Sequence, residues 1–123
     1  MKKLFISFIS IFSFTVFAAE VVDISSQALL EAKNQDWLIL DVRTAKEYDQ
    51  GHVPGSINIS HDQIADQIQK LSSHKDKPIV VYCRSGYRAG KAAKILLEND
   101  FKQIKHLEGD MLGWQEAGHE IEK

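Results

Sequence analysis

The segment Cys83-Arg84-Ser85-Gly86-Tyr87-Arg88 carries the strongest chemical signal in this 123-residue sequence. It separates an apolar run of strand length at residues 79–82 from an alanine-rich stretch with helical spacing. A loop that enters a helix presents backbone N–H groups without partners, and the helix dipole adds partial positive charge. Gly86 permits a tight curl that aims these groups inward. With the two arginines, the loop is predicted to bind anions and to favour a thiolate on Cys83.

Cys83 is the only cysteine, so it cannot form a disulfide within the chain. Exported proteins usually hold their cysteines in disulfide pairs. An unpaired cysteine in such a protein is therefore either buried and inert or kept for its reactivity. The position of Cys83 at the carboxyl end of a predicted strand favours reactivity, because ligands of open α/β sheets bind at these strand ends.

The elements that must position this loop follow from the alternation of short apolar runs and helical patterns, which predicts an α/β fold with a mostly parallel sheet. Strands are expected at residues 21–22, 37–40, 57–59, 79–82 and 104–107, and helices at 28–32, 89–97 and 111–117. A serine at 25 or 26 suits the start of the first helix. Ile64, Ile68 and Leu71 form one further apolar stripe with helical spacing.

Three charged residues follow the predicted strand at 37–40. Asp41 ends that strand, and Thr44 with Glu47 matches a capping box, which starts a short helix before Gly51. Asp41, Arg43 and Glu47 are predicted to form an ion-pair and capping network near the site rather than to act on substrate. Two alternatives stay open for Arg88, which either binds a donor anion or forms an ion pair, for example with Asp41. Arg84 either binds a donor or is a solvated charge.

The other conspicuous side chains favour structural roles. Trp37 and Trp114 are predicted to belong to the core, and His52 to anchor a Gly/Pro turn. The remaining histidines lack metal-ligand spacing, so neither a metal nor another cofactor is expected; they are His61, His74, His106 and His119.

Four segments in a fixed order give the chain a likeness to a known family. They are L-D-V-R with E-Y at residues 40–48, G-H-V-P-G-S-I-N at 51–58, V-Y-C-R-S-G-Y-R-A at 81–89 and L-E-G-D-M-L-G-W at 107–114. Over residues 21–121 the chain resembles the rhodanese family. One departure is visible in the last segment, where Asp110 stands in place of the family's second glycine.

This resemblance implies a five-stranded parallel sheet with helices on both faces. It also implies transfer of a sulfane sulfur from thiosulfate, or a similar donor, to a thiophilic acceptor such as cyanide or a thiol. Cys83 would be the nucleophile that carries the sulfur as a persulfide. The substrate-binding residues would be those of the following loop, namely Arg84, Ser85, Gly86, Tyr87 and Arg88.

Three other functions compete with this interpretation. Rhodanese-fold phosphatases have a similar loop, but theirs has five residues between the cysteine and the arginine, whereas four lie between Cys83 and Arg88. A sulfur-carrier or binding module would hold sulfur with little small-molecule turnover. Thiol–disulfide exchange is disfavoured because no second cysteine can resolve a mixed disulfide.

The first residues predict export. Lys2 and Lys3 precede an uncharged apolar run that ends near Ala18, the pattern of a secretory signal peptide at residues 1–18. A single domain would then occupy residues 19–123, in the periplasm and without stable membrane association. Two of the 15 basic side chains leave with the peptide while all 17 acidic ones stay, which shifts the net charge from −2 to −4. An acidic domain without a basic cluster is not expected to bind nucleic acid.

Overall fold

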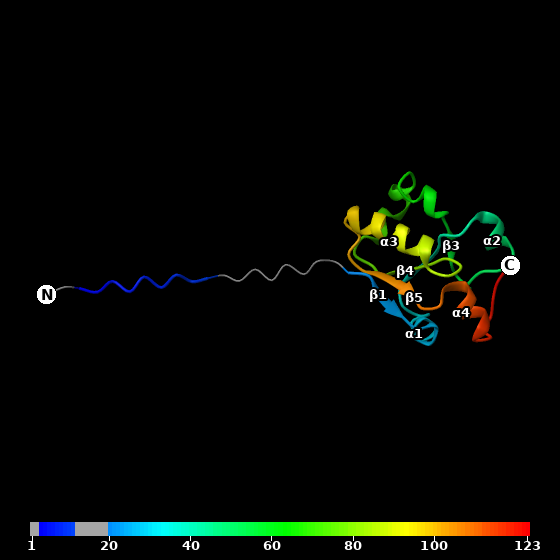
Figure 1. Ribbon diagram of the computed structural model, residues 1–123, viewed down its shortest axis with the longest axis horizontal. Coiled ribbons are helices and arrows are strands. Elements are labelled where there is room, and N and C mark those ends of the chain that lie inside the picture. Colours follow the sequence, from blue (N-terminus) through cyan, green and yellow to red (C-terminus); the bar gives the residue numbers. More distant parts are fainter. Residues whose placement is uncertain (1–2, 12–19) are drawn as a thin grey trace.

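The computed structural model describes residues 3–11 and 20–123. Residues 3–11 have no regular secondary structure, and the folded domain begins beyond residue 20 (Figure 1). The predicted cleavage point after Ala18 lies outside the described residues, as do residues 1–2 and 12–18 of the predicted signal peptide. Within the described part of the chain, no helix has the length and apolar character needed to cross a membrane.

A five-stranded sheet forms the centre of the described domain. Its strands are β1 (Val22–Ile24), β2 (Leu38–Asp41), β3 (Ile57–Asn58), β4 (Ile79–Tyr82) and β5 (Ile104–Leu107). Their spatial order is β1-β5-β4-β2-β3, and every neighbouring pair is parallel. The order reverses between β4 and β2, where loops leaving adjacent strand ends diverge and leave room for a ligand site.

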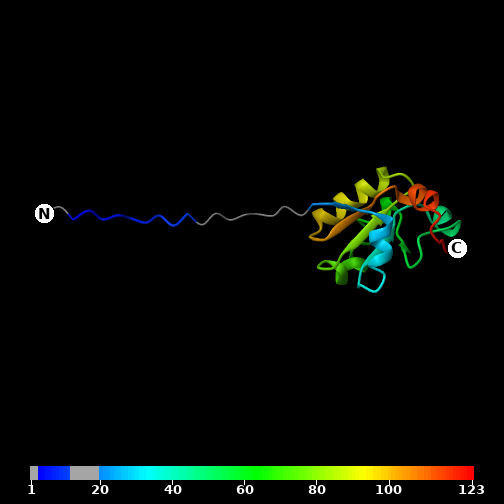
Figure 2. The same ribbon diagram turned by 90° about the horizontal axis from the view of Figure 1, so that it is seen from below.

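Helices cover both faces of the sheet. Helix α3 (Tyr87–Glu98) lies on one face, above the sheet in Figure 1. Two 3₁₀ segments, η1 (His61–Gln63) and η2 (Ile68–His74), share that face. The opposite face carries α1 (Ser26–Glu31) and α4 (Asp110–Glu116), and Figure 2 shows this side from below. Helix α2 (Ala45–Asp49) follows directly after β2.

The alternating side chains of β4 bind the two layers together, since each strand residue is buried and successive residues point to opposite faces. Ile79 and Val81 belong to the core beneath α3, together with Leu40 and Leu96. Val80 and Tyr82 belong to the opposite core, where they pack with Trp114. A central strand must be apolar on both faces when helices cover both sides of the sheet, and β4 meets this requirement.

The α/β fold predicted from the sequence is therefore confirmed, with all strands parallel. The expected bounds agree for the strands at 79–82 and 104–107. The expected helical stripe of Ile64, Ile68 and Leu71 does not form an α-helix, because the segment folds into 3₁₀ turns. Ile64 and Leu71 are nevertheless buried. Trp114 is buried as expected, whereas Trp37 is only partly buried at the edge of the core.

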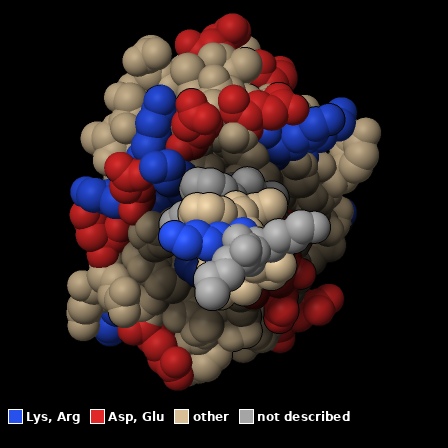
Figure 3. All heavy atoms as spheres, turned by 90° about the vertical axis from the view of Figure 1, so that its left-hand side faces the viewer, with Lys and Arg blue, Asp and Glu red and all other residues tan. Residues whose placement is uncertain are grey.

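Charged side chains of both signs are interspersed over the face of the molecule shown in Figure 3. This mixture agrees with a composition of 15 basic and 17 acidic side chains. On the visible part of that face, neither sign of charge forms a continuous patch.

Candidate active site

The carboxyl ends of β2 and β4 define the site. Asp41 and Tyr82, the last residues of these two strands, lie opposite each other in the sheet register. Cys83 follows Tyr82 directly, and α3 begins at Tyr87. The parallel pairing therefore brings Cys83 to the same edge of the sheet as Asp41, which is the arrangement that the strand-end rule predicts.

The Cys83 thiol lies inside the loop that connects β4 with α3. Cys83 is 1% exposed, and its Sγ accepts a hydrogen bond from the N–H of Gly86 at 3.0 Å. Gly86 has φ +123°, a conformation that side-chain-bearing residues rarely adopt. It is also the N-cap residue of α3 and provides no side-chain cap. The N–H groups at the start of this 12-residue helix thus suit an anion beside the sulfur.

Helix α4 fixes the orientation of the same loop. The N–H groups of Met111 and Leu112 donate to the carbonyl oxygens of Cys83 and Arg84, at 2.9 and 3.2 Å. These contacts tie two successive loop carbonyls to the start of α4. The loop conformation therefore depends on the segment at residues 107–114 as well as on its own glycine.

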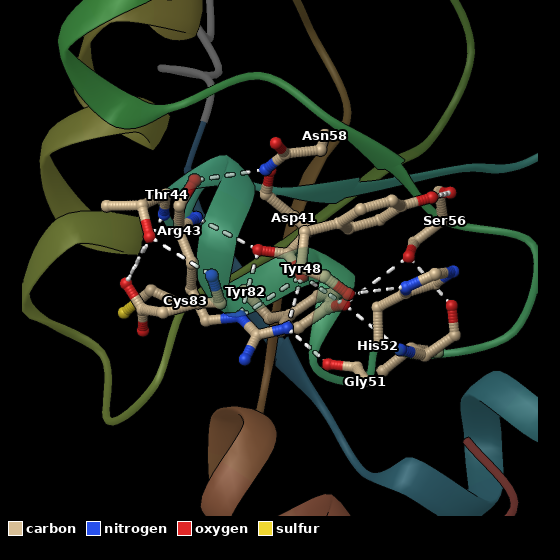
Figure 4. Close-up of polar contacts among 12 residues, drawn as sticks. Asp41, Arg43, Thr44, Tyr48, Gly51, His52, Ser56, Asn58, Tyr82 and Cys83 are labelled. Carbon is tan, nitrogen blue, oxygen red and sulfur yellow. Dashed lines mark hydrogen bonds and ion pairs between the residues drawn. The ribbon is translucent and has the colours of Figure 1, made fainter. Parts of the chain in front are cut away.

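A buried ion pair lies at the base of the site (Figure 4). Arg43 Nη2 donates to Asp41 Oδ2 at 2.7 Å and to the carbonyl oxygen of Gly51 at 2.8 Å. The amide of Asn58 donates to the backbone carbonyls of Asp41 and Arg43 at 3.0 Å each. Asp41 is fully buried and Arg43 is nearly so. These contacts join β2 to the turn at 51–58. Asp41 and Arg43 are therefore engaged in holding these two segments together.

Tyr82 extends this network across the sheet. Its hydroxyl donates to Asp41 Oδ2 at 2.6 Å and accepts from the N–H of Val53 at 3.1 Å. Burial, followed by the nearby Asp41 charge, raises the pKa of Tyr82 far above its ordinary value of 10.0. The hydroxyl is therefore a permanent donor in the physiological range and links β4 to the turn that carries Val53.

Arg88 and Glu47 form the second ion pair of the site. Arg88 Nη1 and Nη2 donate to the two carboxylate oxygens of Glu47 at 2.6 and 3.0 Å. Glu47 also accepts from the Thr44 backbone N–H, which completes the predicted capping box at the start of α2. Hydrogen bonding to Arg88 lowers the pKa of Glu47 from 4.5 to about 2. The pairing of Arg88 with Asp41, considered from the sequence, is wrong because Asp41 is held by Arg43 and Tyr82.

A cleft of about 200 Å³ opens beside these ion pairs. Arg43, Glu47 and Arg84 contribute charged groups to it, and the other lining residues are Gln50, Gly51, Met111, Leu112 and Gln115. Arg84 and Ser85 are exposed, and Tyr87 is 75% exposed beside Lys91. Among the five predicted substrate-binding residues, Arg84 is therefore the one that lines the cleft. Unlike Arg88, it forms no ion pair with another residue that the structure describes.

Sequence reasoning missed a second group of charged residues at the site. The backbone N–H of Cys83 donates to Asp110 Oδ1 at 3.0 Å, and His106 Nε2 lies 3.0 Å from both Asp110 carboxylate oxygens. His106 Nδ1 lies 3.1 Å from Asp23 Oδ1. The sequence feature that could have identified this group is Asp110, which stands where the last family segment has a glycine. His106, in contrast, was classed as one of several scattered histidines.

Among the described residues, no hydrogen bond or ion pair connects the other histidines to the Cys83 loop. His52 stacks on Tyr48 with ring centroids 3.6 Å apart and contacts the Tyr48 carbonyl, in line with an anchoring role in its turn. His119 contacts the Ser26 hydroxyl on the opposite face. Within residues 3–11 and 20–123, no cluster of histidine, cysteine and acidic side chains has a geometry suited to a metal ion.

Comparison with known proteins gives the family context of this geometry. A family model described as "Rhodanese-like domain" matches residues 25–117. A curated protein named tRNA uridine(34) hydroxylase, from Photorhabdus laumondii, is 35% identical over 91 residues. The match covers 71% of this chain but 26% of that protein, so the chain spans about a quarter of the length of this relative.

Solved structures agree with the fold. A rhodanese-related protein from Thermoplasma volcanium superimposes with a TM-score of 0.73 at 28% identity, covering 82% of this chain and 97% of that one. A thiosulfate sulfurtransferase from Pseudomonas aeruginosa gives a TM-score of 0.76 at 24% identity, covering 82% of this chain and 20% of that one. The second likeness concerns the fold alone.

Proposed function

The chain belongs to the rhodanese-like domain family, and on that premise we propose that it is a sulfurtransferase in which Cys83 carries a sulfane sulfur as a persulfide. The observation that carries this proposal is the environment of the Cys83 sulfur. Sγ accepts the Gly86 N–H at the start of α3, where helix N–H groups stabilise negative charge. A persulfide places its negative charge on the outer sulfur, so it gains from the same surroundings as the thiolate.

The proposed reaction has two covalent steps. The Cys83 thiolate attacks the outer sulfur of thiosulfate, a new S–S bond forms, and the bond to the sulfonate sulfur breaks with its electron pair leaving on sulfite. An acceptor such as cyanide or a thiolate then attacks the outer persulfide sulfur. The electron pair of that S–S bond returns to Cys83 and restores the thiolate. Such a sequence is nucleophilic catalysis of the ping-pong type.

The charged residues divide between donor binding and support. Arg84 faces the cleft and is proposed to attract the sulfonate end of the donor. Arg88 is held by both oxygens of Glu47, so its proposed role is to fix α3 against α2 and to add positive charge near the loop. Asp41 and Arg43 support the strand ends from below.

Two observations favour sulfur transfer over phosphate chemistry. Four residues separate Cys83 from Arg88, which makes the ring of loop N–H groups smaller than the five-residue loop of related phosphatases. Arg88 is also engaged by Glu47, whereas a phosphatase needs an arginine that grips the phosphate in the transition state. Aryl phosphate hydrolysis by the purified protein would contradict this assignment.

The name of the curated relative raises a different activity. The match to the tRNA uridine(34) hydroxylase of Photorhabdus covers 26% of that protein. The proposal therefore takes from the family the sulfur chemistry of Cys83 and leaves hydroxylation aside. The remaining alternative within the same chemistry is a carrier that passes persulfide sulfur to another protein.

Steady-state kinetics with thiosulfate and cyanide test the proposal. Thiocyanate formation should show parallel lines in double-reciprocal plots, as a ping-pong reaction does. Cys83→Ser should abolish the activity while its unfolding midpoint stays near that of the wild type. A carrier would instead acquire sulfur on Cys83 but turn over poorly with cyanide. Full activity of Cys83→Ser would refute both versions.

A further inference from the structure

Asp110 combines three features that a passive surface carboxylate does not show. It is 1% exposed, although it is an acidic residue. Its φ of +53° lies in the left-handed region, where glycine is free of strain and an L residue is not. Its carboxylate accepts the backbone N–H of the proposed nucleophile, Cys83, at 3.0 Å. A strained and buried acid beside the reactive group indicates a role for the carboxylate itself.

The carboxylate also borders the sulfur cradle, by which we mean the loop between β4 and α3 that surrounds Cys83 Sγ. A Cβ on Gly86 would lie 3.3 Å from Asp110 Oδ2, and the N–H of the same glycine donates to Cys83 Sγ. The negative charge of Asp110 is thus placed next to the groups that must accept a charged sulfur. Without a positive charge nearby, this carboxylate would disfavour ionisation of the Cys83 thiol and binding of an anionic donor.

His106 offsets this charge. Its Nε2 lies 3.0 Å from Asp110 and its Nδ1 lies 3.1 Å from Asp23. Carboxylates only accept hydrogen bonds, and a neutral imidazole carries a single N–H, so both contacts are satisfied together only by the imidazolium. Hydrogen bonding to Asp110, against the opposing effect of burial, raises the pKa of His106 above its ordinary value of 6.5.

Among the described residues, the charged groups that contact His106 are the carboxylates of Asp23 and Asp110. Asp23 reaches it from β1 and Asp110 from the start of α4. The residues of α3 and its preceding loop that share a hollow of about 200 Å³ with it are Gly86, Ala89, Gly90 and Ala93, which are uncharged. This hollow opens His106 to proton exchange with solvent.

We propose that Asp110 is a positioning residue for Cys83 and that protonation of His106 sets the net charge beside the sulfur, and hence the acceptance of anionic donors. The group Asp23–His106–Asp110 carries a net charge of −1 with His106 protonated and −2 without. Because the additional negative charge lies beside the cradle, an anion meets greater repulsion at high pH. This inference rests on the proposed function only in that thiosulfate is such an anion.

The test compares alkylation of Cys83 by iodoacetate, an anion, with alkylation by neutral iodoacetamide from about pH 5.5 to 9. The ratio of the two rates cancels the thiolate fraction and its nucleophilicity and reports the local charge. In the wild type the ratio should fall about three- to tenfold as His106 loses its proton. This readout does not need sulfur transfer, so its failure is separate from failure of the proposed function.

Three variants sharpen the result. His106→Gln should hold the ratio at the low value of the high-pH wild type, without a step. Asp110→Asn should raise the ratio at the low-pH and high-pH ends and move the step to lower pH, because His106 loses its main carboxylate partner. Asp110→Gly removes the carboxylate and the backbone strain together, and its control is Asp100→Gly at the other left-handed position, φ +67°. Asp100→Gly should behave as the wild type.

Two outcomes would overturn the inference. One is the same profile in the wild type and His106→Gln, including no alkylation of either. The other is a ratio in Asp110→Asn that does not rise above the wild-type value at pH 9. Persulfide formation from thiosulfate in the same variants should follow the ratio, with Asp110→Asn faster at high pH than the wild type.

Discussion

Arg88 of α3 and Glu47 of α2 face each other as a two-point ion pair, with N–O distances of 2.6 and 3.0 Å. The pair joins α3, which follows Cys83, to α2, which follows β2. Glu47 is at the same time the third residue of α2, and its carboxylate accepts the backbone N–H of the N-cap residue Thr44. One carboxylate therefore starts one helix and fixes the position of another beside the cleft.

Acid stability should depend on this carboxylate. The pKa of Glu47 falls from 4.5 to about 2 on folding, so its stabilisation is present above pH 4.5 and is lost as the pH falls toward 2. Glu47→Gln should reduce the free energy of unfolding at pH 7 by about 1–3 kcal/mol. In urea unfolding, the difference from the wild type should shrink steadily below about pH 5.

Glu116→Gln is the matched control, since Glu116 is an exposed acid on α4. It should change the unfolding free energy by less than about 0.5 kcal/mol at any pH. A deficit in Glu47→Gln that stays constant from pH 7 to pH 3 would show that the lost interaction is not the ionised pair.

Donor binding should depend on Arg84 and not on the general positive charge of this region. Arg84 is exposed at the cleft, whereas Arg88 is engaged by Glu47. Arg84→Ala should raise the KM for thiosulfate about tenfold through loss of a charge-assisted contact, with little effect on unfolding. Lys94→Ala, which removes an exposed charge from α3, should leave KM unchanged. Equal changes in both variants would assign the effect to general electrostatic attraction.

The hydroxyl of Tyr82 should contribute to stability rather than to chemistry. It donates to buried Asp41 at 2.6 Å and accepts from Val53 at 3.1 Å. Tyr82→Phe leaves both partners without this contact and should cost about 1–3 kcal/mol in thermal or urea unfolding. Tyr87→Phe, at a 75% exposed position, should be neutral. A neutral Tyr82→Phe would mean that the Asp41 network is satisfied by other groups.

Export remains a prediction from the sequence. Expressed with its first 18 residues in a Gram-negative host, the protein should be recovered from the periplasm with Ala19 as its first residue. N-terminal sequencing or intact mass of the periplasmic fraction measures this directly. Recovery of a chain that retains Lys2 and Lys3 would contradict cleavage.

Local signals were sufficient for β4, which is an unbroken apolar run, and for β5, whose two end residues Ile104 and Leu107 are apolar and buried. They were insufficient for the segment at 61–74, where apolar spacing fits a helix but the backbone does not follow it. Ser60 makes no side-chain capping contact, and Gln67 lies outside helical geometry at φ −108° and ψ 15°. A hydrophobic stripe alone therefore did not determine the helix type.

The site shows the same division between local and distant information. The strand-end rule placed Cys83 and Asp41 at one edge, because parallel pairing acts on every strand alike. It could not pair Arg88 with Glu47, or His106 with Asp23, since these partners are 41 and 83 residues apart. Such contacts depend on how α2, β1 and α4 pack. Asp110 was visible only as a departure from the family pattern.

Sulfur transfer through Cys83 is tested most directly by the intact mass of the purified, reduced domain before and after incubation with thiosulfate, and again after cyanide. One sulfur atom should be added to the wild type and none to Cys83→Ser. Cyanide should then remove this sulfur and release thiocyanate. A wild-type mass that does not change, with the thiol of Cys83 verified as free, would contradict sulfur transfer from thiosulfate by this protein.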